Sequence, residues 1–505
     1  RMHRLLTDAA RARFDSRELR SAYERARAVA TATGVRVAAP EGERGGEVLL
    51  PVAIPTLVFG TIRGQTALPV RDGAVDWRPR LVFPGLADGE SLTRKTQAPR
   101  RGRILSADGK TLAEGPAGAR SSPLAELGAS VAGTVGEAEN GRERRELFYR
   151  GFPGHAPLGK TGLERIFERR LAGRPGGVLL AGRRVLRRGE ARAAAPVRST
   201  IDTRIQGAAV EALAGRLGGI AALDPATGAV RALAGVAFSA PQPPGSTFKI
   251  VTTTAALEAE AVKPSDKFPV QSSALIDGVE LENANGELCG GTFEDAFAHS
   301  CNSVFGPLGV KVGSRRLVEV AERYGWNKAP TLAGEKPSTL PESEQIVSPL
   351  EIGSTAIGQF KTLATPLLMA SVAQTVANGG VRLPPTVASG ERARGLRVTS
   401  RAVSATLERL MVAVVARGTG TAAAIPGAKV AGKTGTAELE DTRGPGSEET
   451  ASGDPANTDA WFTAFAPAGR PRIAVAVLLV RNGAGGTTAA PAARTVLASA
   501  LAPRR

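Results

Sequence analysis

A proline-proline-glycine turn near the middle of the chain constrains the local fold more than any other feature. Pro243-Pro244-Gly245 leads directly into Ser246-Thr247-Phe248-Lys249, and apolar residues then follow helical spacing to about Ala261. Because this tripeptide favours a turn, we expect Ser246 at the N-terminus of a helix. Lys249 lies three residues further on, so both side chains are expected on one helix face.

A serine and a lysine on one face can form a nucleophile and its base. A neutral amine can accept the hydroxyl proton, and desolvation or nearby cations lower a lysine pKa enough to allow it. Taken alone, the pattern is more typical of a serine N-cap followed by a solvated lysine. Its interpretation therefore depends on the rest of the chain.

Two further motifs follow in order. The chain has a single S-x-x-K, and its only S-x-N is Ser300-Cys301-Asn302. Lys433-Thr434-Gly435-Thr436 comes after the apolar Val430-Ala431, which predicts a strand whose side chains alternate between two faces. These three motifs in this order form the set typical of penicillin-recognising serine enzymes.

Acyl transfer from an amide explains each residue type. The reaction needs an activated nucleophile, a proton for the leaving amine, donors for the oxyanion and a cation for a terminal carboxylate. We expect these roles to fall to Ser246 (nucleophile), Lys249 (base), Ser300 (proton relay), Asn302 (holding Lys249 or the substrate amide), Lys433, Thr434 and Thr436 (carboxylate), Gly435 (close substrate backbone) and the backbone N–H groups of Ser246 and Thr436 (oxyanion).

A competing signal lies upstream. Gly154 to Thr161 matches G-x-x-x-x-G-K-T, the phosphate-binding loop of nucleotide hydrolases. Such a loop should follow a buried apolar strand, but the segment that precedes it, residues 142 to 150, is short and rich in charged residues. A nucleotide hydrolase therefore stays a remote alternative. The second K-T-G, Lys160-Thr161-Gly162, is not expected to be catalytic, because it opens a helix and precedes the nucleophile.

Charge does not indicate nucleic-acid binding. The net charge is +17, but aromatic residues make up only 4% of the chain, too few for a stacking surface. We therefore expect no nucleic-acid partner. No stretch of about 18 uncharged apolar residues predicts a membrane span.

Composition and periodicity divide the chain into three predicted domains, at residues 1–96, 97–195 and 196–505. The first is predicted as a small α+β unit with strands at 48–52, 56–62 and 66–70, and the second carries a helix at 163–171. The third should contain one sheet backed by helices. Its predicted elements are helices at 205–217 and 491–501 and strands at 220–223, 229–234, 429–432, 460–466 and 473–480.

These motifs resemble those of class B, monofunctional penicillin-binding proteins with an NTF2-like N-terminal domain, as in methicillin-resistance-type transpeptidases. Further similarities cover nearly the whole chain: Phe59-Gly60-Thr61, Leu81 to Leu86, Arg101 to Ile104, Asp108 to Ala113, Gly162-Leu163-Glu164, Thr200-Ile201-Asp202, Ala356 to Gln359 and Ala460-Trp461-Phe462. The resemblance implies an NTF2-like α+β domain, a β-rich pedestal (dimerisation) domain and a transpeptidase domain with a central antiparallel sheet flanked by helices.

The resemblance also implies a function. It implies peptidoglycan D,D-transpeptidation, with a D-Ala-D-Ala donor and an amine acceptor, and covalent inhibition by β-lactams. It implies no metal and no cofactor, an outward-facing position tethered to the cell membrane, and membrane-embedded partners of wall synthesis. The sequence opens on Arg1, and we expect the first helices of the N-terminal domain and the anchor to be absent from it.

Alternatives remain within the same group of enzymes. A D,D-carboxypeptidase would use these residues with water as acceptor. A class D β-lactamase is a single domain whose middle motif ends in an apolar residue, unlike Asn302, and a β-lactam sensor would need a signalling domain. Because a wall-building enzyme works outside the cytoplasm, we expect Cys289 and Cys301 to form a disulfide. Leu439 to Asp459 is expected to form a mobile loop beside the site.

Overall fold

The computed structural model describes residues 2–439 and 455–503, so most of the predicted 439–459 loop lies outside the described residues. The chain forms two compact units. The first comprises Arg1–Ile104, Ala113–Ser121 and Gly133–Val197, and the second comprises Leu105–Leu112, Ser122–Ala132 and Arg198–Arg505. The short strands β7 (Ile104–Leu105), β8 (Thr111–Ala113) and β13 (Val197–Arg198) contain three of the points where the chain passes from one unit to the other.

The first unit is built on two antiparallel sheets. One has the order β1-β3-β4-β5, with β2 also paired to β3, and the other has the order β12-β11-β6. Its elements are η1 (Met2–Leu5), α1 (Asp8–Arg13), α2 (Ser16–Ala30), β1 (Arg36–Val37), β2 (Gly42–Arg44), β3 (Glu47–Pro55), β4 (Thr61–Arg71), β5 (Ala74–Val75), η2 (Pro79–Val82), β6 (Leu92–Gln97), β9 (Val135–Gly136), α4 (Gly141–Tyr149), β10 (Leu158–Gly159), α5 (Gly162–Ile166), α6 (Glu168–Leu171), β11 (Gly176–Ala181) and β12 (Arg184–Gly189).

Helix α2 illustrates how local sequence sets an element of this unit. Asp15 accepts hydrogen bonds from the Arg17 and Glu18 N–H groups, and Glu18 bonds back to the Asp15 N–H, so the helix begins with a full capping box. Its apolar face contributes Leu19 to one buried cluster and Ala30 to another. The unit therefore has hydrophobic cores of its own.

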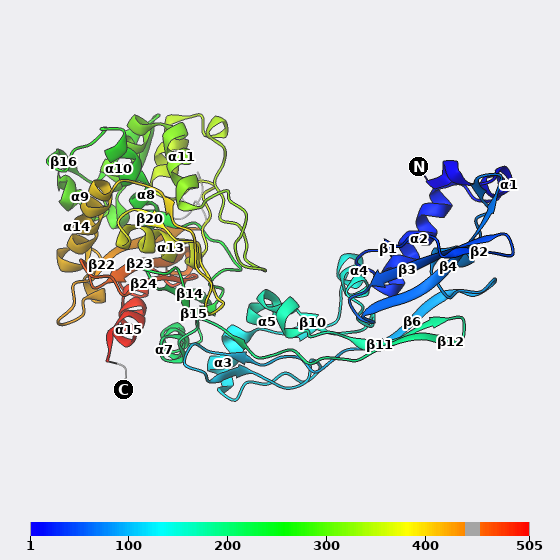
Figure 1. Cartoon of the computed structure of the whole chain (residues 1–505). Helices are drawn as coiled ribbons and strands as arrows, with labels where there is room; N and C mark the ends of the chain where they lie inside the picture. Colours follow the sequence, from blue (N-terminus) through cyan, green and yellow to red (C-terminus); the bar gives the residue numbers. More distant parts are fainter. Residues whose placement is uncertain (1, 440–454, 504–505) are drawn as a thin grey trace. The chain divides into compact units, whose positions relative to one another are not determined.

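The second unit is centred on a five-stranded antiparallel sheet with the order β15-β14-β24-β23-β22 (Figure 1). Its elements are α3 (Ala125–Ala132), α7 (Thr203–Leu213), β14 (Gly218–Leu223), β15 (Val230–Gly235), η3 (Gly245–Phe248), α8 (Lys249–Glu258), β16 (Lys267–Gln271), β17 (Ser273–Ile276), β18 (Val279–Glu282), η4 (Ala284–Gly286), β19 (Cys289–Thr292), α9 (Phe293–Ala298), α10 (Asn302–Val312), α11 (Ser314–Tyr324), η5 (Ser343–Gln345), α12 (Pro349–Ala356), α13 (Pro366–Ala377), β20 (Val381–Arg382), β21 (Leu396–Arg397), α14 (Arg401–Arg417), η6 (Thr421–Ala423), β22 (Ala431–Glu438), η7 (Pro455–Asn457), β23 (Thr458–Ala466), β24 (Ile473–Leu479) and α15 (Ala489–Leu501).

Helices cover both faces of this sheet. On one face, Val475 and Val477 of β24 share a buried cluster with Ile205 of α7 and Val496 of α15. On the other, Thr463 of β23 donates a hydrogen bond of 2.8 Å to the Met369 carbonyl in α13. Strands β23 and β24 are buried along their whole length, which explains why apolar residues make up all of β24 and most of β23. The predicted sheet flanked by helices is confirmed.

Four predicted elements differ from the structure. The strand predicted at 429–432 is β22, which begins at Ala431 and continues to Glu438. Thr56 to Gly60 form the turn between β3 and β4, not a strand, and Val58 and Phe59 are apolar because this turn is buried in the core. The helix predicted at 163–171 is split at Phe167 into α5 and α6. Helix α7 ends at Leu213, because Ala214 is left-handed. Within the described residues, no helix is long and apolar enough to span a membrane.

Candidate active site

Ser246 and Lys249 lie in one continuous helical run. Ser246 is in η3, and Lys249 begins α8 directly afterwards. Thr247 fixes the turn by donating a 2.7 Å hydrogen bond to the Pro244 carbonyl, and Phe248 packs edge-on against Trp326. Ser246 is partly exposed, whereas Lys249 is fully buried. A reachable hydroxyl therefore lies one helical turn from a desolvated amine.

Strand β22 runs directly against this turn. A Cβ atom on Gly435 would come within 2.7 Å of the Pro244 carbonyl oxygen, so the close approach requires glycine. On the other side, the Gly245 N–H donates a 3.0 Å hydrogen bond to the carbonyl of Gly358, whose φ is +78°. The turn that carries Ser246 is thus held between β22 and the residue pair that follows α12.

Lys249 joins the first motif to the second. Its Nζ lies 3.1 Å from Ser300 Oγ, 2.5 Å from the Ser300 carbonyl oxygen and 2.7 Å from Asn302 Oδ1. Ser300 lies in the turn between α9 and α10 with a left-handed φ of +63°, a strained conformation for serine that recurs at functional sites. Within the described residues, no hydrogen bond joins Ser246 Oγ to Lys249 Nζ.

Lys433 joins the third motif to the same serine. Its Nζ donates to Ser300 Oγ at 2.8 Å and to the Thr434 carbonyl at 3.1 Å. Ser300 Oγ therefore lies between two lysine amines, one from α8 and one from β22. The structure brings together Lys249, Ser300, Asn302 and Lys433, which the sequence spreads over nearly two hundred residues.

The two amines are too buried to carry full charge together. Burial lowers the pKa of Lys249 well below its ordinary value, and the nearby Lys433 charge lowers it further. Burial also lowers the pKa of Lys433, to about 7. Both amines lie over aromatic rings, Lys249 over Phe305 and Lys433 over Phe297. A neutral Lys249 beside a partly protonated Lys433 suits one as base and the other as cation.

The remaining residues of the third motif lie along β22. Thr434 Oγ1 is 2.5 Å from Thr419 Oγ1, and Thr436 Oγ1 accepts a 3.3 Å hydrogen bond from the Gly485 N–H. Thr419 also donates its N–H to the Ala298 carbonyl, just before the Ser300 turn. Sequence reasoning missed Thr419, and its small-residue surroundings, Gly418-Thr419-Gly420, carry only a weak signal of a close approach.

Cys289 and Cys301 form a disulfide in the structure, with Cα atoms 5.7 Å apart. Cys301 lies between Ser300 and Asn302, and Cys289 begins β19. The bond thus ties the second motif to a neighbouring strand.

The competing phosphate-loop pattern does not form such a loop. The pattern itself contains a two-residue strand, β10, which pairs antiparallel with β9, and the element before the pattern is helix α4 rather than a buried parallel strand. Burial lowers the pKa of Lys160, but hydrogen bonds to Glu143 and Glu139 outweigh this and raise it overall. The amine lies 3.0 Å from Glu143 and 3.1 Å from Glu139. Lys160 is therefore paired with carboxylates rather than open to phosphate.

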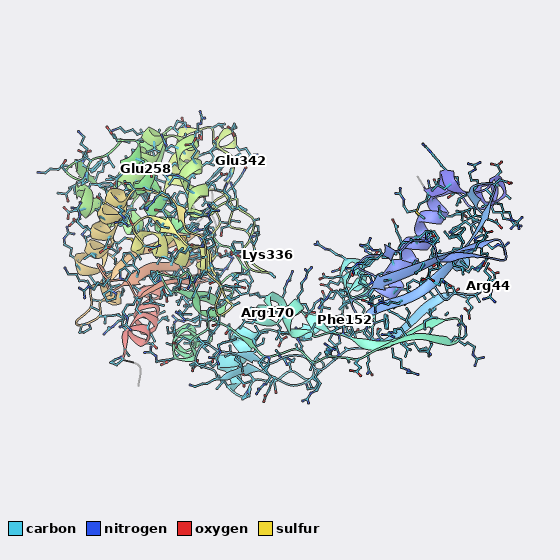
Figure 2. All side chains as sticks on the ribbon, in the orientation of Figure 1. Arg44, Phe152, Arg170, Glu258, Lys336 and Glu342 are labelled. Carbon is cyan, nitrogen blue, oxygen red and sulfur yellow. A yellow bond between two sulfur atoms is a disulfide. The ribbon has the colours of Figure 1, made fainter. Side chains whose placement is uncertain are left out.

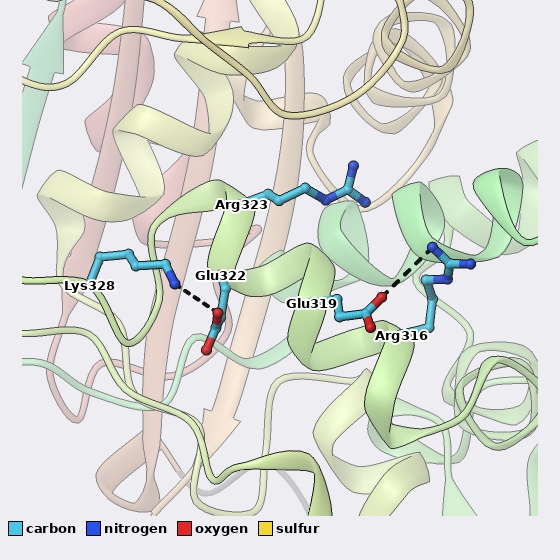
Figure 3. A pocket seen from close by; sticks show the side chains of 5 residues that line it. All are labelled: Arg316, Glu319, Glu322, Arg323 and Lys328. Atoms are coloured by element: carbon cyan, nitrogen blue, oxygen red, sulfur yellow. Dashed lines mark hydrogen bonds and ion pairs between the residues drawn. The ribbon is translucent and has the colours of Figure 1, made fainter.

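A separate hollow lies on helix α11 (Figure 3). Its lining is entirely charged: Arg316, Glu319, Glu322, Arg323 and Lys328. These groups pair with one another or with Glu258, which ends α8 and is labelled in Figure 2. No residue of the three motifs lines this hollow, so it is not the candidate active site.

Comparisons with known proteins agree with this geometry. Residues 218–498, more than half of the chain, match the family model described as the penicillin binding protein transpeptidase domain. The "Peptidoglycan D,D-transpeptidase PbpA" of Mycobacterium tuberculosis is 37% identical over 297 residues, which cover 52% of this chain and 56% of the relative. The alignment spans just over half of that relative's length. "Peptidoglycan D,D-transpeptidase MrdA" of Acinetobacter baumannii is 26% identical over 74% of this chain and 65% of its own.

Solved structures are similar over a longer stretch. PBPA from Mycobacterium tuberculosis matches with a TM-score of 0.62 and 27% identity, covering 80% of this chain and all of that one. The D,D-transpeptidase domain of a peptidoglycan glycosyltransferase from Eggerthella lenta matches with a TM-score of 0.64 and 29% identity, covering 80% of this chain and 98% of that one. The chain therefore belongs to the penicillin-binding protein transpeptidase family.

Proposed function

We propose that this protein is a peptidoglycan D,D-transpeptidase that cross-links stem peptides through an acyl-enzyme on Ser246. The observation that carries the proposal is the contact of Lys249 Nζ with both Ser300 and Asn302, together with the hydrogen bond that Lys433 Nζ donates to the same Ser300 hydroxyl. The proposed base and the proposed cation thus meet at Ser300, the proposed proton relay, and the base lies three residues after Ser246 in the same helical run. Two of the named relatives are peptidoglycan D,D-transpeptidases, which supports the same substrate class.

The residues assign each step of the acylation. Ser246 Oγ attacks the carbonyl carbon of the penultimate D-Ala while neutral Lys249 accepts its proton. The backbone N–H groups of Ser246 and Thr436 bind the oxyanion. As the peptide bond breaks, Ser300 passes its proton to the leaving D-Ala amine and takes a proton from protonated Lys249. An amine of a second stem peptide then attacks the ester carbonyl, the new amide bond forms as the ester C–O bond breaks, and the amine's proton returns through Lys249 to Ser246 Oγ.

The third motif binds the substrate's terminal carboxylate. Lys433 supplies the positive charge, Thr434 and Thr436 supply hydroxyl groups, and Gly435 lets the substrate backbone lie along β22. A β-lactam carries a carboxylate near its strained amide, so it would bind at the same carboxylate site. Attack by Ser246 on the strained amide would then leave a covalent ester on Ser246. Solved structures of the mycobacterial relative include a penicillin G acyl-enzyme complex, which supports this reaction.

We also propose the domain arrangement and location that the family resemblance implies. Residues 1–96 would form an NTF2-like domain, 97–195 a pedestal and 196–505 the transpeptidase domain. A similarity to solved structures over 80% of the chain extends beyond residues 218–498 and supports a pedestal. The Cys289–Cys301 disulfide supports an extracytoplasmic position, since such bonds persist in oxidising compartments. A membrane anchor and membrane-embedded partners complete this proposal.

Covalent labelling tests the function. The protein is incubated with benzylpenicillin, the intact mass is followed with time, and the adduct is located by peptide mapping. We expect a long-lived adduct on the peptide containing Ser246, and none in Ser246→Ala, whose thermal melting should stay nearly unchanged. Rapid recovery of free enzyme would indicate a β-lactamase instead. An adduct that persists in Ser246→Ala would contradict the assignment of the nucleophile.

Transpeptidase and carboxypeptidase activities need a second assay. A D-Ala-D-Ala stem peptide is supplied with and without an amine acceptor, and the products are separated by mass. A cross-linked product supports the proposed function. Release of D-Ala with water as the only acceptor would favour a D,D-carboxypeptidase.

A further inference from the structure

The second motif is fastened from outside the catalytic network. Three consecutive residues, two of which belong to this motif, each bond to the segment that runs from the end of β18 to the start of β19. Cys301 forms the disulfide with Cys289, Asn302 Nδ2 donates to the Glu282 carbonyl at 2.7 Å, and the Ser303 N–H donates to Asn283 Oδ1 at 2.9 Å. The start of α10 is therefore held by a different part of the chain rather than by its own cap.

Helix α10 lacks an ordinary N-cap. Its N-cap residue is Cys301, whose side chain makes no capping hydrogen bond. The first N–H groups of a helix have no partner within it, so the Ser303 N–H needs an acceptor from elsewhere. Asn283 supplies that acceptor, twenty residues upstream. It acts as a cap delivered from another element.

The Asn283 amide is fixed by its own contacts. Its Nδ2 donates to the Gln271 carbonyl at 2.8 Å and to the Glu287 carbonyl at 2.9 Å, and its side chain is buried, with 3% of its surface exposed. Both amide protons and the carbonyl oxygen are therefore engaged. A buried amide with every group paired cannot rotate without losing hydrogen bonds, which makes it a rigid support.

We propose that Asn283 is a positioning residue for the catalytic lysine, acting through Asn302. Asn283 fixes the first turn of α10, that turn carries Asn302, and Asn302 Oδ1 accepts the 2.7 Å hydrogen bond from Lys249 Nζ. Loss of the outer cap lets this turn shift, and small displacements of a catalytic group cost large factors in rate. The inference rests on the proposed function for its kinetic consequence, but the cap itself can be tested separately.

The chain offers a closely matched control. Gln374 of α13 is fully buried and makes the same set of bonds: Nε2 donates to the Pro225 carbonyl at 3.0 Å and to the Val381 carbonyl at 3.4 Å, and Oε1 accepts from the Leu383 N–H at 3.1 Å. None of these contacts involves the three motifs. Asn283→Ala and Gln374→Ala therefore remove the same number and kind of hydrogen bonds.

The kinetic test measures benzylpenicillin acylation by stopped-flow, separating the acylation constant k2 from the binding constant KS. In Asn283→Ala we expect k2 to fall at least about tenfold and KS to stay within about threefold, because the β22 carboxylate site is untouched. Gln374→Ala should lose comparable thermal stability but keep k2. Equal k2 in the unaltered protein and Asn283→Ala would overturn the proposal.

A conservative variant separates position from stability. Asn283→Asp keeps an oxygen for the Ser303 N–H but loses both amide donors, so it should melt earlier while keeping k2 within about threefold. A tenfold loss of k2 in Asn283→Asp would overturn the proposal. If Asn283→Ala does not fold, the k2 of Asn283→Asp is the kinetic test of the proposal.

Hydrogen exchange tests the cap without relying on activity. We expect the Ser303 amide to exchange faster in Asn283→Ala than in the unaltered protein or Gln374→Ala. Unchanged exchange would overturn the inference. If the unaltered protein exchanges as expected but is never acylated, the proposed function fails while the cap stands.

Discussion

Ser300 lies between two buried amines, and this arrangement constrains the charge of both. Its hydroxyl has only one proton and two lone pairs, yet both Lys249 and Lys433 approach it within 3.1 Å. Two full positive charges at this spacing would repel each other in a desolvated site. Loss of a proton from Lys249 therefore removes the repulsion that a charged Lys433 would feel. The geometry thus favours a neutral base beside a cation before any substrate binds.

This charge balance predicts a pH-dependent stability. The pKa of Lys433 is about 7 in the fold against an ordinary value of 10.5, so above pH 7 the unfolded chain holds more protons at this group. The free-energy cost of burying the charged Lys433 amine therefore lowers the stability of the fold in full below pH 7. This cost decreases as the pH rises toward 10.5. In Lys433→Met this dependence disappears. We expect the difference in Tm, variant minus unaltered protein, to be larger at pH 6 than at pH 9 by about 2 °C or more.

Differential scanning fluorimetry at the two pH values measures this difference. Lys328→Met is the matched control, because Lys328 is half exposed and pairs with Glu322 on the surface of α11. That control should show no such decrease between pH 6 and pH 9. A Lys433→Met difference that grew with pH would contradict a buried amine of low pKa.

At the scale of single residues, sequence reasoning found the three motifs but not their supports. Motif residues have chemical types and spacings that report their role. Thr419 and Asn283 act through a hydroxyl contact and a backbone cap, and such bonds depend on which distant segments the fold brings together. The low pKa values of the lysines likewise follow from burial, which no local pattern specifies.

At the scale of elements, predictions succeeded where burial and periodicity agreed. Strands β14, β23 and β24 were predicted because apolar residues dominate each of them. The helix α7 prediction ran past Leu213, because the left-handed residue that ends the helix is Ala214 rather than glycine. Thr56 to Gly60 was included in a predicted strand because its apolar residues are typical of strands. In the structure these residues form a turn, closed by the hydrogen bond from Thr56 Oγ1 to the Gly60 carbonyl.

The turn that carries Ser246 depends on Gly358. This residue has φ of +78°, and a Cβ atom would lie 2.0 Å from the Gly245 carbonyl oxygen and 2.8 Å from Phe248 Cβ. Gly358→Ala should therefore displace η3 as well as strain its own backbone. We expect benzylpenicillin acylation to fall by about a hundredfold, together with a loss of stability of about 2 kcal/mol or more.

Gly390→Ala is the control for backbone strain alone. Gly390 has φ of +86°, but nothing lies within 4 Å of the position a Cβ would take. It should lose only about 1 kcal/mol of stability and acylate normally. Comparable acylation by the two variants would show that contact between Gly358 and the turn that carries Ser246 does not matter for the reaction.

At the scale of the whole molecule, the two compact units have separate buried clusters. The first unit packs Ile54, Phe59 and Leu179 into one core, and the second packs its sheet against α7 and α15. All three motifs belong to the second unit. Because a covalent ligand stabilises only the folded unit that carries it, acylation should act on one core and not on the other.

Differential scanning calorimetry can test whether the two units unfold separately and which of them acylation stabilises. We expect two thermal transitions, since units with separate cores need not unfold together, and we expect benzylpenicillin to raise only one of them. That transition should be the one that Gly358→Ala lowers, because both changes act on the same unit. A mutation in the core of the first unit, Phe59→Ala, should lower the free energy of unfolding of that unit by about 3 kcal/mol, and with it the temperature of its transition. The transition of the acylated unit should keep its temperature. A single transition that acylation and Phe59→Ala both shift would mean that the two cores unfold as one cooperative structure.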